Sequence, residues 1–121
     1  MADTTTPTPI DPLQLPAVVR RYLDAHARHD VAATLACFTP DAVVTDDGRT
    51  SSGHGEISTW LDRSSTEYSY TSTPTGARRI DDEHWEVTQH VQGNFPGGVV
   101  DLVYSFVLAD GLIAGLGIAA T

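Results

Sequence analysis

A short run of histidine and aspartate near the N-terminus is the first group of residues that could carry chemistry. His26, His29 and Asp30 form an H-x-x-H-D pattern, and side chains three apart share one face of a helix and could hold a metal ion. A metal centre needs further convergent ligands, and the sequence names none beside this run. We therefore expect no metal and no other cofactor, and His26 could instead serve as an acid or base.

Other residue types exclude whole classes of function. All seven basic residues are arginines, and without lysine the chain has neither a Schiff-base nucleophile nor the phosphate-binding lysine of a P-loop. The single cysteine, Cys37, cannot form an internal disulfide, and its apolar neighbours predict a small buried side chain. A net charge of −9 would repel both nucleic acids and anionic membranes. We expect no partner of either kind.

The length predicts one domain. A chain of 121 residues can bury one core but not two, and no apolar run approaches the roughly 20 residues of a membrane helix. Residues 1–10 lack the features of a signal peptide and are expected to form a flexible tail, with a single domain over 11–121. The expected location is the cytoplasm, and the bias toward Ala, Arg, Asp, Gly and Thr is typical of a GC-rich bacterial genome.

Helical periodicity dominates the first half of the chain. Asp11 and Pro12 with Gln14 predict a capped helix start, although Pro16 could mark a later one. Apolar residues at helical spacing continue to about residue 29, and Asp30 can cap a second, shorter helix. The expected helices therefore cover about 12 or 16 to 29, 30–38 and 54–63, with a loop after Gly48.

The second half changes to a period of two. Alternating apolar and polar residues predict strands over 42–45, 67–80, 84–92, 99–108 and 112–118. Pro74 and Gly76 should bend or bulge the second of these strands, and Asp110-Gly111 predicts a hairpin turn between the last two. Helices followed by antiparallel strands define an α+β domain, with three N-terminal helices packed on a strongly curved, mostly antiparallel sheet.

Three sequence segments carry a resemblance to a known family. They are Y-L-D-A-H-A-R-H-D, F-T-P-D-A-V-V-T-D-D and G-H-G-E-I-S-T-W-L, in the order helix, strand and helix, ahead of the long antiparallel meander. Over about residues 13–119 the chain resembles the nuclear transport factor 2-like superfamily, in its SnoaL-like and ketosteroid isomerase-like branches. The resemblance implies a cone-shaped barrel with an interior pocket, in a homodimer. Its members include isomerases, polyketide cyclases, epoxide hydrolases and proteins without catalysis.

The resemblance also implies catalytic positions. Ketosteroid isomerases use a tyrosine of the first helix as the oxyanion donor and an aspartate at the end of the first strand as the base, positions that match Tyr22 and Asp46. Their second, protonated acid aligns with Tyr104, so the chain departs from the family's own oxyanion site. The structural alternatives stay open: Tyr22 in the core, Asp46 in a turn, and Tyr104 in the core or the pocket wall.

The same comparison suggests which side chains meet a ligand. The expected contacts are Trp60, Trp85, Val87, Gln89, Phe106 and His26, and Tyr68, Tyr70 and Phe95 add aromatic surface. Epoxide hydrolases of this superfamily hold a water between aspartates with an arginine, a role for which Arg78 or Arg79 could be placed.

These observations predict a protein that binds a small apolar molecule. The sharper hypothesis is an isomerase or cyclase that transfers protons on an enolisable carbonyl compound, with Asp46 as base and with Tyr22 and Tyr104 as hydrogen-bond donors. One alternative is a non-catalytic ligand-binding or regulatory protein. Another is a dimerisation module whose sheet face, with His84, Glu86, Thr88 and His90, packs against a second copy.

Overall fold

In the part of the chain that the structure describes, the fold consists of one seven-stranded sheet and three α-helices. The computed structural model describes residues 7–67 and 69–120, so Tyr68 lies outside the described residues. In chain order the elements are β1 (Thr8–Ile10), the 3₁₀ turn η2 (Pro12–Gln14), α1 (Ala17–Ala27), α2 (Val31–Leu35), β2 (Phe38–Asp46), β3 (Arg49–Ser52), α3 (Gly53–Glu67), β4 (Tyr70–Arg79), β5 (His84–Gly93), β6 (Val99–Ala109) and β7 (Leu112–Ala120). The strand order across the sheet is β1-β4-β5-β6-β7-β2-β3, and only the β2–β7 pair is parallel.

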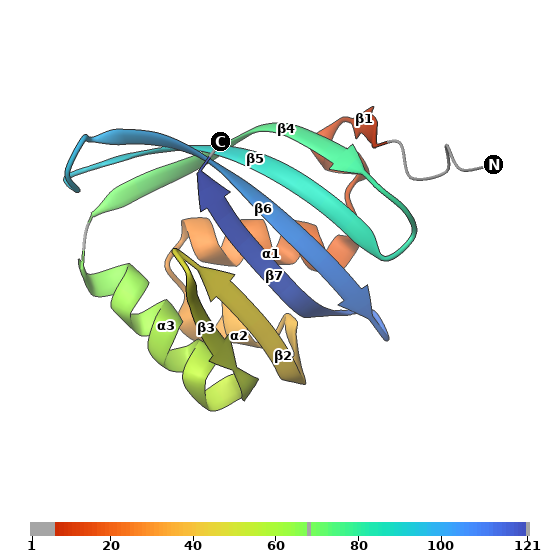
Figure 1. Cartoon of the computed structure of the whole chain (residues 1–121), viewed down its shortest axis with the longest axis horizontal. Helices are drawn as coiled ribbons and strands as arrows, with labels where there is room; N and C mark the ends of the chain where they lie inside the picture. The colour runs from red at the N-terminus through yellow and green to blue at the C-terminus, as the bar shows by residue number, and fades with distance from the viewer. Residues whose placement is uncertain (1–6, 68, 121) are drawn as a thin grey trace.

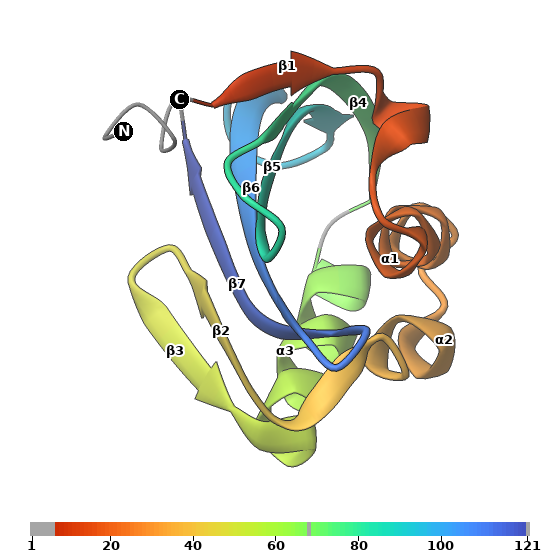
Figure 2. The ribbon, with the colours of Figure 1, turned by 90° about the vertical axis from the view of Figure 1, so that its right-hand side faces the viewer.

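The sheet is strongly curved around the helices. Figure 1 shows the long strands β4 to β7 arching over α1, and Figure 2, turned by 90°, shows the sheet curling from β3 round to β1 with α1 and α2 on its open side. Helix α3 packs against β2 and β3. The predicted α+β cone is confirmed. In the described part of the chain no helix combines the length and apolar character needed to cross a membrane.

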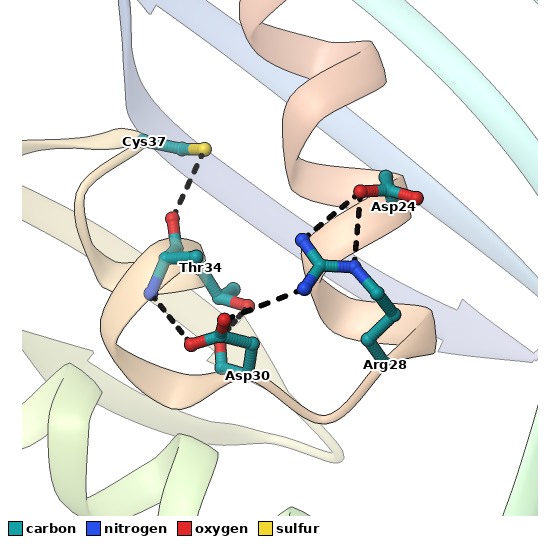
Figure 3. Close-up of polar contacts among 6 residues, drawn as sticks. Asp24, Arg28, Asp30, Thr34 and Cys37 are labelled. Carbon is teal, nitrogen blue, oxygen red and sulfur yellow. Dashed lines mark hydrogen bonds and ion pairs between the residues drawn. The ribbon is translucent and has the colours of Figure 1, made fainter.

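A network of short contacts fixes the corner between α1 and α2 (Figure 3). His29 adopts a left-handed backbone with φ of 56° and ends α1. Asp30 then caps α2, because its Oδ1 accepts a hydrogen bond of 3.0 Å from the Ala33 amide. Arg28 bridges the two helices, since its guanidinium contacts both Asp24 and Asp30. The predicted pair of helices therefore forms, joined by these contacts.

The buried side of this corner holds the cysteine. Cys37 is 4% exposed, and its Sγ lies 3.6 Å from the Ala33 carbonyl oxygen (Figure 3). Burial raises the pKa of the Cys37 thiol, although Arg21 acts in the opposite direction. The thiol is thus a small buried group, as the sequence predicted.

A helical segment begins at each of the two predicted starts near the N-terminus, after Asp11 and after Pro16. Asp11 and Gln14 form a complete capping box, but it closes only the turn η2, and α1 begins after Pro16. The expectation that residues 1–10 form a flexible tail is wrong for residues 8–10. These residues pair with β4 as strand β1, because β4 would otherwise leave its backbone groups unpaired at the sheet edge, and Ile10 packs against the core.

The segment around β2 differs most from the prediction. The second helix ends at Leu35 rather than residue 38, because the side chain of Phe38 is 1% exposed and its backbone pairs with Ile113 of β7. The expected loop after Gly48 is strand β3. Asp47 and Gly48 both have positive φ, the geometry of a tight two-residue hairpin that returns the chain antiparallel to β2.

The later strands follow the prediction closely. The β4–β5 register shifts between Pro74 and Gly76, which confirms the expected bulge. Asp110 and Gly111 have φ of 53° and 77° and form the predicted hairpin turn between β6 and β7. The inner faces of these strands and α1 share one core, whose largest fully buried side chains are Tyr22, Phe38 and Phe106.

Candidate active site

A cavity of about 410 Å³ opens on the concave side of the sheet. Polar groups reach its wall from four elements: His26 from α1, Asp46 from β2, Trp60 from α3 and Tyr70 from β4. Strands β5, β6 and β7 supply a mostly apolar remainder that includes Val91, Val100, Leu102 and Ile118, together with the hydroxyl-bearing Tyr104. A mostly apolar wall with a few convergent polar groups is the usual form of a small-molecule site.

Two neighbouring carboxylates belong to this wall, the half-buried Asp46 and the exposed Asp47. Asp46 is the last residue of β2, and its parallel pairing with Ile118 of β7 holds its backbone in the sheet. The Trp60 indole N–H donates a hydrogen bond of 2.9 Å to Asp46 Oδ2. Burial raises the pKa of the Asp46 carboxyl, and Asp47 adds to this, whereas the Trp60 hydrogen bond opposes it. The result is an oriented carboxylate with increased basicity.

Asp46 also borders a second, more polar cleft. This outer cleft lies between β3 and α3, has a volume of about 840 Å³, and includes Arg49, Glu56 and Arg63. Asp46 and Trp60 belong to the walls of both hollows. The Asp46 carboxylate therefore lies at the boundary between the mostly apolar cavity and the more polar outer cleft.

Three neutral polar rings face Asp46 across the cavity. Burial, followed by the charge of Asp46, raises the pKa of Tyr70, and burial raises that of Tyr104 well above its ordinary value. Burial, followed by the nearby His29, lowers the pKa of His26 to about 4. The Tyr70 hydroxyl lies 3.5 Å from His26 Nε2. At neutral pH both phenols keep their protons and His26 is uncharged.

Tyr22 lies one layer behind the wall. Its side chain is 0% exposed and does not line the cavity, but its ring stacks on His26 at 5.4 Å and lies 6.4 Å from Tyr104. The Tyr22 hydroxyl has no hydrogen-bond partner among the described residues. Burial raises the pKa of Tyr22 well above its ordinary value. The structure thus brings Tyr22 and Asp46 to the same interior but places the phenol outside direct reach of the cavity.

Four of the expected ligand contacts do not reach the cavity wall. Trp85, Val87, Gln89 and Phe106 lie on the concave face of the sheet but are absent from the lining. Phe106 packs edge-on against Tyr22 with ring centroids 5.4 Å apart, so this part of the cone is filled by helix α1. Trp85 lies at the far end of β5, where its indole donates to the Asp82 carbonyl oxygen. The alternation of the strands predicted correctly that these residues lie on the concave face. It could not show where on that face the packed core ends and the cavity begins.

The two arginines considered for an epoxide-hydrolase site are engaged elsewhere. Arg78 forms an ion pair with Glu86, and Arg79 pairs with Asp82 and lies over the Trp85 ring. Neither arginine lines the cavity. The structure therefore does not bring either of them to Asp46.

The side chains of His26, His29 and Asp30 do not converge on one point. His26 is buried in the cavity wall, whereas the His29 ring contacts the Tyr70 carbonyl oxygen at 3.3 Å and Asp30 caps α2. Within residues 7–67 and 69–120 no group of three metal-ligating side chains is found. These three residues serve separate structural contacts.

Several lining residues were not identified as site residues from the sequence. Tyr70 and Phe95 were expected only as general aromatic surface, and Leu102 and Ile118 only as strand residues. The sequence does not show which face of β4 carries Tyr70, because the strand contains a bulge between Pro74 and Gly76. The observed register pairs Ser72 with Val91, and Tyr70 lies two residues from Ser72 on the same face. Phe95 reaches the wall from the β5–β6 turn, whose shape the sequence leaves open.

His26 should make the folded state sensitive to acid. Its folded pKa of about 4 lies below the ordinary 6.5, so the unfolded chain binds the proton first as the pH falls through this window. Stability is therefore expected to decrease by about 3 kcal/mol between pH 6.5 and pH 4 from this group. Urea unfolding at several pH values measures this change in the wild type and in His26→Gln, where the decrease should be much smaller.

A matched control uses a histidine on the surface. His84→Gln removes an exposed imidazole that contacts Asp81 and should retain most of the wild-type pH dependence. An equal decrease in wild type and His26→Gln would show that His26 is not the group responsible.

Comparison with known proteins agrees with this fold. A protein from Sinorhizobium meliloti described as a "putative polyketide cyclase" is 36% identical, with a TM-score of 0.85 over 91% of this chain and 100% of the other. A hypothetical protein from Catenulispora acidiphila with a ketosteroid isomerase-like fold, solved with trimethylamine, is 20% identical, with a TM-score of 0.78 over 88% and 86% of the two chains. The epoxide hydrolase/cyclase-like enzyme SalBIII, which acts in pyran ring formation in salinomycin, is 18% identical, with a TM-score of 0.74 over 86% and 88%. No curated protein sequence gives a significant match.

The chain has the nuclear transport factor 2-like fold. The model of the SnoaL-like domain matches residues 19–116, and the chain belongs to this family. The resemblance seen in the sequence is therefore confirmed.

Proposed function

We propose that this protein is an isomerase or cyclase that moves a proton on an enolisable carbonyl compound bound in the cavity. The observation that carries the proposal is the basic carboxylate of Asp46, oriented by Trp60 on a largely apolar wall opposite neutral phenols. A carboxylate in such a setting is suited to proton abstraction next to a carbonyl group. The similarity to a protein described as a "putative polyketide cyclase" supports the same class of chemistry.

In the proposed mechanism Asp46 removes the proton from the carbon next to the carbonyl group. The electron pair moves onto the carbonyl oxygen, and the Tyr104 hydroxyl donates a hydrogen bond to the enolate that forms. In a β,γ-unsaturated ketone Asp46 then returns the proton to the γ carbon of the dienolate, which moves the double bond and isomerises the compound. In a dicarbonyl compound the enolate carbon instead attacks the second carbonyl group, which closes a ring, and Asp46 returns its proton to the alkoxide that forms. Tyr70 and His26 form a neutral pair that positions the carbonyl end.

Tyr22 has a supporting position in this proposal. Its stacking on His26 and its contact with Tyr104 hold the two rings that face the ligand. Tyr104, and not Tyr22, is the oxyanion donor that we propose, because Tyr104 lies on the cavity wall.

The proposal is tested by α-proton exchange. The purified protein is mixed with 2-acetylnaphthalene, an apolar methyl ketone, in D₂O, and NMR follows replacement of the methyl protons by deuterium. Exchange faster than in buffer alone supports proton transfer. Binding of the ketone without faster exchange would instead favour the alternative of a non-catalytic ligand-binding protein.

The open face of the sheet supports a homodimer as part of the proposal. On this face His90 pairs with Asp101 at 2.7 Å, and the side chains of Val99 and Val107 are 50% and 38% exposed. A half-polar surface with exposed valines is suited to contact with a second copy. We propose a homodimer in the bacterial cytoplasm, with a small hydrophobic molecule as the ligand of each copy.

Sedimentation equilibrium tests the dimer. Val103 lies in the middle of this face on β6, opposite Thr88 of β5, and Val103→Glu should weaken self-association by tenfold or more because it would bury a charge. Leu13→Glu is the control, since Leu13 is 79% exposed and lies in η2, outside the strands of this face. A wild type that sediments as a monomer of 13.0 kDa would contradict the dimer.

A further inference from the structure

Three polar atoms beside the cavity lack both solvent and a hydrogen-bond partner. Among the described residues these are Tyr22 Oη, Ser72 Oγ and Gln89 Nε2. Gln89 is the most demanding case, since it is 2% exposed and its amide carries two donor hydrogens. A buried donor left unpaired costs about 1–3 kcal/mol of stability, so an uncompensated glutamine in this core needs an explanation.

The strand register places Gln89 next to the ligand cavity. On the concave face Asp46 pairs with Ile118, and Ile118 pairs with Tyr104, forming one row across the sheet. The next row joins Ala120, Leu102 and Gln89. All the other residues of these two rows line the cavity: Asp46, Ile118, Tyr104, Ala120 and Leu102.

The immediate surroundings of Gln89 are also cavity wall. Leu102 lies directly opposite on β6, and Val91 lies two positions along β5, on the same face. Both line the cavity. Ser72, whose hydroxyl is likewise unpartnered, pairs with Val91 and so occupies the adjacent corner on β4. Two of the three orphaned donors, those of Gln89 and Ser72, thus lie together on β5 and β4, three and four strands from Asp46 in the sheet order.

We propose that Gln89 is a second recognition group, whose carboxamide turns between Val91 and Leu102 and donates a hydrogen bond to an oxygen at the far end of the ligand. This inference rests on the proposed function, because it takes the reacting end of the ligand to lie at Asp46. The ligand is then a compound with an apolar ring body and an oxygen function at each end. Three strand spacings separate the two positions, on the order of 14 Å along the sheet before the side chains shorten it, which suits two fused rings with short substituents.

In the ligand-free protein the unpaired Gln89 amide lowers the stability of the fold. A leucine at position 89 would pack among the same apolar neighbours without an unpaired donor, so Gln89→Leu should be at least as stable as the wild type. A residue retained only for packing or for a structural hydrogen bond would show the opposite effect.

The test compares two probes that differ only at the far end. The first is 2,6-diacetylnaphthalene, which carries a carbonyl group at both ends, and the second is 2-acetyl-6-isopropylnaphthalene, which has nearly the same shape with one carbonyl group. Calorimetry or fluorescence titration gives the dissociation constant of each probe. The wild type should bind the diacetyl compound about tenfold more tightly, the effect of one buried hydrogen bond. In Gln89→Leu this ratio should fall to about one, and the melting temperature should not decrease.

Three results would overturn the inference. They are an unchanged affinity ratio in Gln89→Leu, a lower melting temperature of this variant, and a wild type with no preference between the probes or no binding of either. Asp46→Asn separates this inference from the proposed function, since it should lose α-proton exchange and keep the affinity ratio. If exchange persists in Asp46→Asn, the proposed function fails, and the Gln89 contact is still decided by the affinity ratio.

Discussion

Asp46→Asn is expected to lower the rate of α-proton exchange from 2-acetylnaphthalene by about 10²- to 10⁴-fold, the usual contribution of a positioned base. Asparagine keeps the shape of aspartate, and its side-chain oxygen can still accept the Trp60 hydrogen bond. It cannot take up the substrate proton. NMR in D₂O measures the exchange rate, and titration of the same ketone checks that the cavity still binds it.

The same variant should not be less stable at neutral pH. Because burial raises the pKa of Asp46 in the folded state, the folded protein favours the protonated carboxyl, and stability from this group is lost as the pH rises from the unfolded toward the folded pKa. An uncharged asparagine removes that loss. A reduced exchange rate together with an unchanged or higher melting temperature would therefore identify a loss of chemistry rather than of folding.

Asp41→Asn is the matched control for this substitution. Asp41 lies on the same strand but is exposed and outside the cavity, and its contact with the Thr39 hydroxyl survives in asparagine. The control should exchange at the wild-type rate. Equal losses in the two variants, or wild-type exchange in Asp46→Asn, would remove Asp46 from the mechanism.

Tyr104→Phe is expected to slow the same exchange by about 10²- to 10³-fold, as the loss of one oxyanion donor usually does. Tyr104 is 3% exposed and lies on the wall, and Tyr104 and Asp46 each pair with Ile118 on the concave face. Phenylalanine fills the same volume, so the cavity should keep its shape. The effect should fall on the maximal rate more than on ketone binding, because the hydrogen bond strengthens as charge develops on the oxygen.

Tyr22→Phe provides the comparison. The Tyr22 hydroxyl is buried without a partner, so its removal should raise the free energy of unfolding by about 1 kcal/mol and leave exchange within a few-fold of the wild type. Urea unfolding and the NMR assay measure the two quantities. A large loss of exchange in Tyr22→Phe, with little loss in Tyr104→Phe, would return the oxyanion role to Tyr22.

Local sequence signals accounted for most of the architecture. The period of 3.6 residues in the first half and of two in the second half predicted the three helices and the long strands, because burial of one face requires that spacing. Asp-Gly at 110–111 and the bulge at Pro74 acted through backbone conformation within a few residues. The short strands β1 and β3 were missed because their pairing partners, and not their composition, make them strands.

The position of Asp46 at the end of β2 and the apolar alternation of β5 to β7 could be read from the chain itself. Which of those alternating residues meet a ligand was decided only by the tertiary structure. Parallel pairing of β2 with β7 brings Asp46 beside Ile118 and two strands from Tyr104. Helix α1 packs Tyr22 against Phe106, and neither side chain lines the cavity. A sequence period identifies the inner face of a strand, but the curvature of the sheet and the helix packed on it decide where that face is core and where it is cavity.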